Sequence, residues 1–274
     1  MAIANQQLLD GLIAAAIEAG QIILDVYSRP IDVTFKADAS PVTEADGRAE
    51  AVLLAALARL APGVPVVAEE SVAAGRVPPA ADRFFLVDPL DGTKEFIHRN
   101  GEFTVNVALI EQGVPVMGVV HAPAAGRLFA GGPAGAFEMA VDDEGAVGGR
   151  RPIRVRPLPA EGVTLLLSRS HGTAATEAFH PAAAVACRQV IGSSLKFCLI
   201  AAGEGDLYPR FGPTMEWDIA AGDAVLRAAG GVVTLPDGTL FPYGRRGRPG
   251  LADFANPSFI AASDIRLVAA GRDL

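Results

Sequence analysis

Two aspartates, Asp88 and Asp91, have the spacing in this chain that most directly indicates chemistry. They follow an apolar run, Phe84–Val87, that predicts a short buried strand. Pro89 lies between them and Gly92 comes directly after, so we expect a sharp turn that aims both carboxylates at one point. Two anions held so close need a cation or a shared proton. Oxygen ligands suit Mg²⁺, although an Asp-x-x-Asp turn is also compatible with a solvated loop.

Further acids stand beside other predicted elements. Glu69 and Glu70 follow a predicted buried strand at Val64–Ala68, a place where an open sheet exposes its active edge. A solvated strand end is the plain alternative. Asp218 follows Trp217 at the start of an alanine-rich helix, where helix capping explains it equally well.

Asp46 lies at another predicted helix start. Thr43 is a good N-cap residue, and Asp46 three residues later completes a capping box in which Asp replaces the usual Glu. The helix is expected to run from about Thr43 to Leu60 and to end before Pro62-Gly63. Capping and compensation of the helix dipole therefore explain Asp46 without any catalytic role.

Composition bounds the class of protein. The chain has 274 residues, of which 50% are hydrophobic, and a formal net charge of −8. It can form one large domain or two smaller ones with a sizeable core. The acidic balance argues against nucleic-acid binding, but a metal and local basic residues can still favour a small anionic substrate. Cys187 and Cys198 form no metal or disulfide pattern, so we expect buried free thiols in a reducing compartment.

The sequence shows no signal-peptide pattern and no apolar run long enough to span a membrane. Residues 6–28 have a helical apolar period, and their polar face has almost no Lys or Arg, which disfavours a membrane-surface helix. We therefore expect a soluble, cytoplasmic protein without a transmembrane segment.

The order of the predicted elements indicates two halves, residues 1–150 and 151–274. The Gly-rich segment 141–151 is the candidate boundary, although a strand hairpin could equally occupy it. The first half ends in consecutive hairpins and hence an antiparallel sheet, with strands expected at residues 103–110, 114–121, 127–130 and 136–139. In the second half, alternating strands and helices indicate a mixed or parallel sheet. Strands are expected there at 163–167, 188–192, 206–210, 232–235 and 259–262, and helices at 173–186, 195–203 and 217–229.

The acidic segments in combination resemble the inositol-monophosphatase-like superfamily of lithium-sensitive, Mg²⁺-dependent phosphatases. The resemblance covers nearly the whole chain, from Ser40 to Pro257. Within the superfamily, five segments look like those of the bacterial 3'(2'),5'-bisphosphate nucleotidases: residues 88–97, 99–106, 168–171, 192–198 and 207–214. Those enzymes remove the 3'-phosphate of adenosine 3',5'-bisphosphate, a by-product of sulfate assimilation. The resemblance implies the sugar-phosphatase fold (α+β or α/β), with helix and sheet layers in the order αβαβα.

The resemblance also implies roles for individual residues. The implied ligands of two or three Mg²⁺ ions are Glu69, Asp88, the Leu90 carbonyl, Asp91 and Asp218. The implied catalytic residues, which orient the attacking water, are Thr93, Asp46 behind it, and Glu69. Gly92 and Thr93 are expected to contact the scissile phosphate, with Glu69, Leu90, Asp91 and Asp218 also close to the substrate. The implied contacts to the rest of the nucleotide are His171, Ser193, Ser194, Lys196 and Arg210.

Arg210 is the main reason for preferring a bisphosphate substrate. It stands where inositol monophosphatases carry an acid, and an Arg pairs bidentately with phosphate. The alternative is an inositol-1-monophosphatase or a related sugar-phosphate phosphatase of the same fold. The chain departs from the usual family pattern at Met215, Glu216 and Asp223, so the resemblance does not define the exact substrate pocket. A plain helix cap is the alternative role for Ser193 and Ser194.

We expect direct attack by water without a covalent intermediate, because no Cys or His lies in a nucleophile motif. The expected partner is a small nucleotide bisphosphate, with no nucleic acid, and the chain is expected to be a monomer or a homodimer. By analogy with relatives, peripheral association with the inner membrane face stays open, although nothing in the N-terminal helix argues for it.

Overall fold

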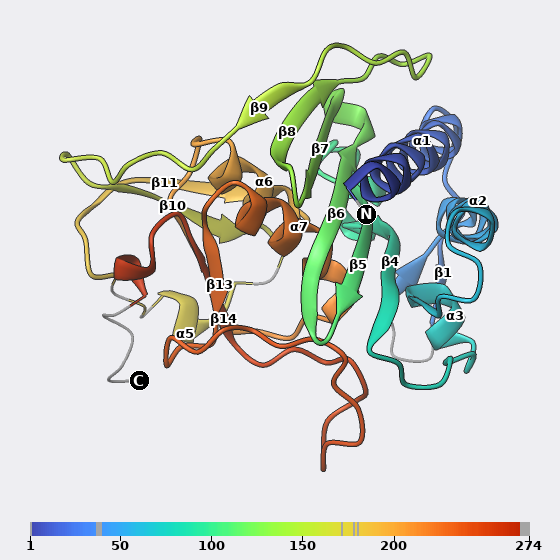
Figure 1. Cartoon of the computed structure of the whole chain (residues 1–274). Helices are drawn as coiled ribbons and strands as arrows, with labels where there is room; N and C mark the ends of the chain where they lie inside the picture. The colour runs from blue at the N-terminus through green and yellow to red at the C-terminus, as the bar shows by residue number, and fades with distance from the viewer. Residues whose placement is uncertain (1, 37–39, 171, 178, 180, 269–274) are drawn as a thin grey trace.

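The computed structural model describes residues 2–36, 40–170, 172–177, 179 and 181–268. In the first half, helices α1 (Ala2–Tyr27) and α2 (Glu44–Leu60) cover one face of a seven-stranded sheet (Figure 1). The strands follow chain order across the sheet: β3 (Val66–Ala68), β4 (Arg83–Asp91), β5 (Thr104–Glu111), β6 (Val114–Ala122), β7 (Arg127–Gly132), β8 (Gly135–Ala140) and β9 (Arg151–Ile153). Only β3 and β4 pair in parallel among the described strands of this sheet, so the predicted run of antiparallel hairpins is confirmed.

Short elements join these strands. A small hairpin of β1 (Thr34–Phe35) and β2 (Pro41–Val42) precedes α2, and helices α3 (Glu69–Ala73) and α4 (Thr93–Ile97) follow β3 and β4. The 3₁₀ turn η1 (Pro123–Ala125) joins β6 to β7.

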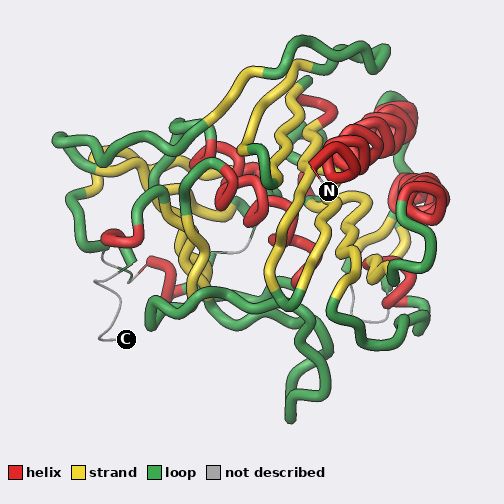
Figure 2. Tube along the Cα trace, in the orientation of Figure 1, coloured by secondary structure: helices red, strands yellow, loops and turns green. Residues whose placement is uncertain are grey.

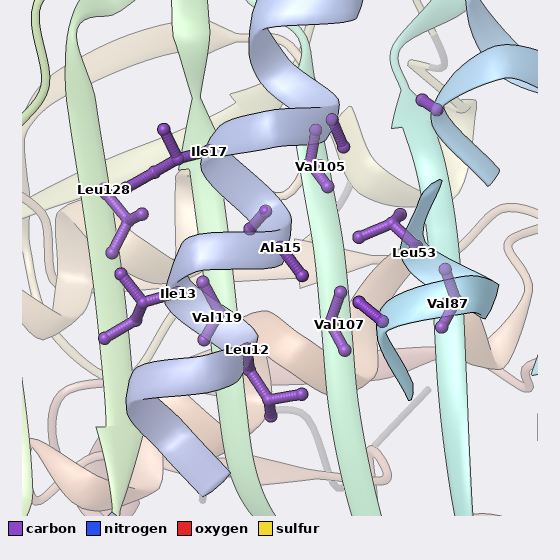
Figure 3. Packing of buried hydrophobic residues seen from close by; sticks show 14 of the residues in the cluster. Leu12, Ile13, Ala15, Ile17, Leu53, Val87, Val105, Val107, Val119 and Leu128 are labelled. Atoms are coloured by element: carbon purple, nitrogen blue, oxygen red, sulfur yellow. The ribbon is translucent and has the colours of Figure 1, made fainter. Parts of the chain in front are cut away.

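The alternation of side chains along β5 explains why the sheet is covered on both faces. Val105, Val107 and Leu109 pack with α1 and α2 (Figure 3), whereas Ala108 and Ile110 belong to the core on the opposite face. Because both sets are buried, residues 107–110 of the strand form a continuous apolar run rather than an alternating pattern.

The second half is built on a five-stranded sheet. Its strands lie in the order β11 (Val185–Ile191), β10 (Val163–Ser168), β12 (Leu207–Arg210), β14 (Phe259–Ala262) and β13 (Val232–Thr234). The first three are parallel and the last two antiparallel to their neighbours, so the predicted mixed sheet is confirmed.

Helices α6 (Leu195–Ala201) and α7 (Glu216–Ala228) lie between the two sheets (Figures 1 and 2). The outer face of the second sheet packs against Phe179 and the 3₁₀ turn η2 (Ile265–Leu267). The layers therefore alternate between helix and sheet, as the sequence led us to expect.

Two glycines let α7 approach the first sheet closely. A Cβ atom at Gly118 would lie 2.5 Å from the Ala221 carbonyl oxygen, and one at Gly131 would lie 2.6 Å from the Val225 Cα atom. Any side chain at these positions would push the helix away from the sheet. Because α7 carries Asp218 near its start, this close packing fixes the helix relative to the end of β4.

Several sequence expectations were wrong in detail. The helix expected at 173–186 is short in the part of the chain that the structure describes: α5 spans Ala174–Glu177, and strand β11 already begins at Val185. Pro181 lies in the segment between them and has no N–H to continue a helix. Residues 69–73 form α3, whereas we expected a loop from residue 72.

Other expectations fail at the edges of the sheets. β9, at residues 151–153, pairs with β8, so the first sheet extends beyond residue 150. Cys187 is exposed rather than buried, because β11 is an edge strand of the second sheet, while Cys198 is buried in α6. Among the described helices, none combines the length and apolarity that a membrane crossing requires.

Candidate active site

One cavity, of about 450 Å³, brings together residues from α3, the end of β4, α4, α6, β12 and the start of α7. It is lined by eleven of the predicted site residues: Glu69, Asp88, Leu90, Asp91, Gly92, Thr93, Ser193, Ser194, Lys196, Arg210 and Asp218. Asp46 is hydrogen-bonded to Thr93 and does not line the cavity itself. The remaining predicted residue, His171, lies outside the described residues.

β4 does not turn sharply at Asp88, as we expected, but continues to Asp91. Its register with β5 shifts between these two residues, so Pro89 and Leu90 form an irregularity in the ladder. Pro89 has no N–H for the ladder, and such irregularities are where a sheet tolerates proline. Gly92 follows with a φ of 91°, a left-handed conformation that favours glycine, and α4 begins at the next residue.

The three aspartates of the cavity share one hydrogen-bonding pattern. Asp88 Oδ1 accepts from the Leu90 N–H at 3.0 Å, Asp91 Oδ2 from the Ser194 N–H at 2.6 Å, and Asp218 Oδ2 from the Met215 N–H at 2.8 Å. Each side chain is thereby oriented through one oxygen. The other oxygen of each carboxylate has no hydrogen-bond partner among the described residues, and it is free to bind a ligand in the cavity.

Burial and mutual repulsion raise the pKa values of these carboxyls. Burial is the largest cause for Asp88 and Asp218, whose pKa values lie well above the usual range, and neighbouring carboxylates raise them further. For Asp91, burial raises the pKa to about 6. A divalent cation would relieve this repulsion, and the donors are all oxygens, so the residues fit a hard ion such as Mg²⁺.

The carboxylates face a common cavity without forming a closed cluster. Among the described residues, no three His, Cys, Asp or Glu side chains stand close enough together to hold one ion as they are. Glu69 is turned toward Lys36, whose Nζ donates to Glu69 Oε1 and Glu70 Oε1 at 2.6 Å each. An ion held by Glu69 would therefore have to replace Lys36.

Our sequence predictions did not include Lys36 as a site residue. It lines the cavity and supplies the positive charge nearest to Glu69 and Glu70. It lies 33 residues before Glu69 in the chain, and no local pattern indicates such a pair. The hairpin of β1 and β2 brings them together, because Lys36 directly follows β1.

Asp46 caps α2, as predicted, and also contacts Thr93. Its Oδ2 accepts from the Thr43 N–H and the Thr43 hydroxyl, each at 2.8 Å, which completes the predicted capping box. Its Oδ1 lies 3.4 Å from the Thr93 hydroxyl, which also lies 3.3 Å from the Leu90 carbonyl oxygen. Burial raises the pKa of Asp46 to about 6. The Thr93 hydroxyl can donate to either Asp46 Oδ1 or the Leu90 carbonyl oxygen, and its lone pairs can then accept a hydrogen bond from a water or a ligand.

The turn at residues 192–196 forms the opposite wall of the cavity. Ser193 has a φ of 46°, an uncommon conformation for a residue with a side chain. The Ser194 hydroxyl lies 3.0 Å from that of Thr104 and 2.8 Å from Asn106 Oδ1. Ser194 occupies the N-cap position of α6 without capping it through its side chain, so its hydroxyl holds the turn in place.

Two basic side chains lie in the same wall. Lys196 is buried, and its ammonium donates to the Ile191 carbonyl oxygen at 3.1 Å and also contacts the Ser193 carbonyl oxygen. Burial lowers the pKa of Lys196 to about 8. Arg210, which is also buried, donates from Nη2 to the Pro213 carbonyl oxygen at 2.7 Å. The cavity therefore has an acidic end and a basic end.

Acids from the first half of the chain also hold this wall. Glu102 accepts two hydrogen bonds from Arg169, at 2.8 and 2.7 Å, and one from the Gly192 N–H at 2.6 Å. Glu95 lines the cavity and accepts from the Ser170 hydroxyl. These contacts join the halves of the chain across the cavity, and our sequence predictions did not include them.

Two of the departures from the family pattern have structural roles. Glu216 accepts from the N–H groups of Gly244 and Arg245 at 2.6 and 2.8 Å. Asp223 is fully buried, and it accepts from Arg227 Nε at 2.7 Å and the Tyr243 hydroxyl at 2.9 Å. Both carboxylates anchor the loop after β13 to α7, and neither lines the cavity.

Relatives of known sequence share most of this chain. The 3'(2'),5'-bisphosphate nucleotidases CysQ of Shigella flexneri and of Escherichia coli K12 are each 44% identical to it over 254 residues, which is 92% of this chain and 98% of theirs. Among solved structures, CysQ from Bacteroides thetaiotaomicron is 37% identical and has a TM-score of 0.72, covering 93% of this chain and 97% of its own. Inositol monophosphatase from Anabaena is 26% identical and has a TM-score of 0.73, covering 97% and 94%.

A family model describes the same likeness over the length of the chain. The model of the inositol monophosphatase family matches residues 4–269, which include both sheets and every residue of the cavity. Phosphatases of this family are typically metal-dependent, in accord with the acidic end of the cavity. The chain belongs to the inositol monophosphatase family.

Proposed function

We propose that this chain is a Mg²⁺-dependent phosphomonoester hydrolase that removes the 3'-phosphate of adenosine 3',5'-bisphosphate, giving AMP and phosphate. The observation that carries the proposal is the presence of Lys196 and Arg210 in the same cavity as the acidic end. A substrate with two phosphates can place one at each end. The names of relatives at 44% identity support the same substrate.

The residues that would hold two or three Mg²⁺ ions are Glu69, Asp88, the Leu90 carbonyl, Asp91 and Asp218. When bound, the metal supplies positive charge that offsets the phosphoryl oxygens and lowers the pKa of water in the site. The chain contributes oriented carboxylates, since each aspartate is fixed through one oxygen by a backbone N–H. Preorganised ligands of this kind lower the cost of assembling the site.

Thr93 and Asp46 would orient the attacking water. The Thr93 hydroxyl can accept a hydrogen bond from water while it donates to Asp46 Oδ1, which lies 3.4 Å away. Glu69, from the adjacent wall, would assist through the metal that it would hold. Gly92 and Thr93 would contact the scissile phosphate, where Gly92 allows close approach because it has no side chain.

The remaining phosphate would lie at the basic end. Arg210 and Lys196 would neutralise its charge, and the Ser193 hydroxyl, at the edge of the same turn, would donate to it. Ser194 would act by holding the turn in place, because its hydroxyl is engaged with Thr104 and Asn106 and its N–H with Asp91. An uncharged group in place of this phosphate would not attract these two buried cations, so it would bind more weakly there.

The test compares phosphate release from adenosine 3',5'-bisphosphate and from inositol 1-phosphate, each with Mg²⁺. We expect a preference for the nucleotide of at least about a hundredfold in kcat/KM, which corresponds to about 2.7 kcal/mol of transition-state discrimination. Comparable turnover, or a preference for inositol 1-phosphate, would instead support a sugar-phosphate phosphatase with the same acidic site.

A further inference from the structure

Glu50 is a buried acid that the proposed mechanism does not use. It lies on α2 four residues after Asp46, and only 4% of its surface is exposed. Its Oε2 accepts from the Glu70 N–H at 2.8 Å, and its Oε1 accepts from the Ser71 hydroxyl at 2.6 Å. Both contacts therefore end in the first turn of α3.

Helix α3 lacks a cap of its own. It begins at Glu69, directly after β3, and its N-cap residue, Ala68, offers no side-chain acceptor. The first N–H groups of a helix have no partner within the helix and need acceptors from elsewhere. Glu50 supplies such an acceptor from α2, so the start of α3 is held by a different helix.

The charge of Glu50 makes its location informative. Glu69 and Glu70 lie in the same segment, and among the described residues the hydrogen bonds of Glu50 come from neutral donors, the Glu70 N–H and the Ser71 hydroxyl. A buried carboxylate beside two acids is unfavourable for stability alone. Its two oxygens do, however, match the two donors of the α3 turn, which fixes the turn in position and orientation.

Helix α2 links this turn to the other side of the site. Asp46 and Glu50 are one turn apart and lie on the same face, about 6 Å apart along the helix axis. Asp46 contacts Thr93, and Glu50 contacts the residues directly after Glu69. The helix therefore sets the separation between the hydroxyl that would orient water and a carboxylate that would hold metal.

We propose that Glu50 is a positioning residue that holds the start of α3, and with it the backbone of Glu69, in place beside the carboxylates that would bind the metal. This inference rests on the proposed metal-dependent hydrolysis. It concerns the metal affinity of the protein, which can be measured without substrate. The matched control is Glu44, which lies on the same helix but is half exposed and pairs with Arg29.

The experiment titrates the purified, metal-free full chain with Mg²⁺ by calorimetry, for the wild type and for Glu50→Met, Glu50→Gln and Glu44→Gln. We expect Glu50→Met to weaken Mg²⁺ binding by at least tenfold, because Met fills the space without accepting a hydrogen bond. Glu50→Gln should lose less, since its amide oxygen can accept from the Glu70 N–H and its NH₂ group can donate to the Ser71 hydroxyl. Glu44→Gln should bind as the wild type does.

The Mg²⁺ dependence of turnover gives a second readout. The activation curve of Glu50→Met should move to higher Mg²⁺ concentration, and saturating Mg²⁺ should restore most of kcat with little change in KM. A merely structural residue would instead reduce the fraction of folded enzyme and leave the shape of the curve unchanged. If Glu50→Met does not fold, Glu50→Gln and Ser71→Ala, which removes one of the two contacts, should still shift the curve several-fold.

The outcomes separate this inference from the proposed function. Wild-type affinity for Mg²⁺ in folded Glu50→Met, or no shift in both Glu50→Gln and Ser71→Ala, would overturn the inference and leave the proposed hydrolysis standing. A wild-type protein without Mg²⁺-dependent phosphatase activity would overturn the proposed function and this inference with it.

Discussion

Replacing Asp91 by Asn should stabilise the metal-free protein. Burial raises the pKa of Asp91 to about 6, from an ordinary value of 3.8. The folded chain thus binds this proton more tightly than the unfolded chain, so stability falls as the pH rises through this interval, and the whole loss is present above about pH 6. A shift of about 2 units corresponds to roughly 3 kcal/mol as an upper limit.

Asparagine at this position should preserve the local structure. The backbone N–H of Ser194 and the side-chain NH₂ group of Asn106 both donate to the same oxygen of Asp91, Oδ2. An amide oxygen can accept both bonds, and the NH₂ group then takes the place of the oxygen that has no hydrogen-bond partner among the described residues. We therefore expect a gain of about 1–3 kcal/mol in the free energy of unfolding at about pH 7 without metal.

Mg²⁺ should reverse this order. A ligand that binds only the folded state adds about 2.7 kcal/mol of stability at a hundred times its Kd. The wild type should gain this stabilisation, whereas Asp91→Asn should gain little and lose most of its turnover. Urea unfolding of both proteins, with a chelator and then with Mg²⁺, measures the two differences directly.

The control for this prediction is Asp82→Asn, because Asp82 is an exposed acid just before the start of β4. It should change the unfolding free energy little under either condition. The reasoning about the acidic end fails if Asp91→Asn is less stable than the wild type without metal. It also fails if Mg²⁺ stabilises both proteins equally.

Three further predictions follow from other parts of the structure. Arg210→Ala should raise KM for adenosine 3',5'-bisphosphate by roughly tenfold or more, because a hydrogen bond to a charged group contributes about 1.5–3 kcal/mol. KM for adenosine 3'-phosphate should change much less. Equal changes in the two KM values would exclude a role of Arg210 in binding the second phosphate. Glu102→Ala frees both Arg169 and the turn at 192–194, so steady-state kinetics should show a several-fold increase in KM for the bisphosphate with kcat nearly unchanged. Burial lowers the pKa of His121 from 6.5 to about 4, so its contribution to stability is complete above about pH 6.5 and falls by up to roughly 3 kcal/mol as the pH drops to 4. In urea unfolding, the free energy of unfolding of the wild type should therefore fall more steeply with decreasing pH than that of His121→Gln. Parallel pH dependences of the two proteins would contradict this.

Several residues in or beside the cavity could be predicted from the sequence because each stands at a recognisable element boundary. Asp46 follows an N-cap threonine, Glu69 follows a buried strand, and Asp218 opens a helix after Trp217. Their local patterns allowed both a structural and a functional role. The structure shows that helix capping coexists with a contact to Thr93 in Asp46 and with a place in the cavity lining in Asp218, because each carboxylate uses one oxygen for the backbone.

The contacts that depend on tertiary structure were not accessible. Lys36 meets Glu69, and Glu50 meets the start of α3, through packing of elements that no local pattern relates. The turn expected at Asp88 proved to be a strand irregularity, because pairing with β5 continues past Pro89 and overrides the local preference for a turn. The exposure of Cys187 depends on β11 lying at the edge of its sheet, which the order of strands in the chain does not reveal.

The most direct test of the account is product analysis by phosphorus NMR after turnover of adenosine 3',5'-bisphosphate. With Mg²⁺ we expect inorganic phosphate and adenosine 5'-phosphate as the only products, and with a chelator we expect no turnover. Release of the 5'-phosphate would contradict our proposal that the 3'-phosphate binds at the acidic end of the cavity and the 5'-phosphate at the basic end. The same products without a divalent metal would contradict the proposed role of the acidic end in metal binding.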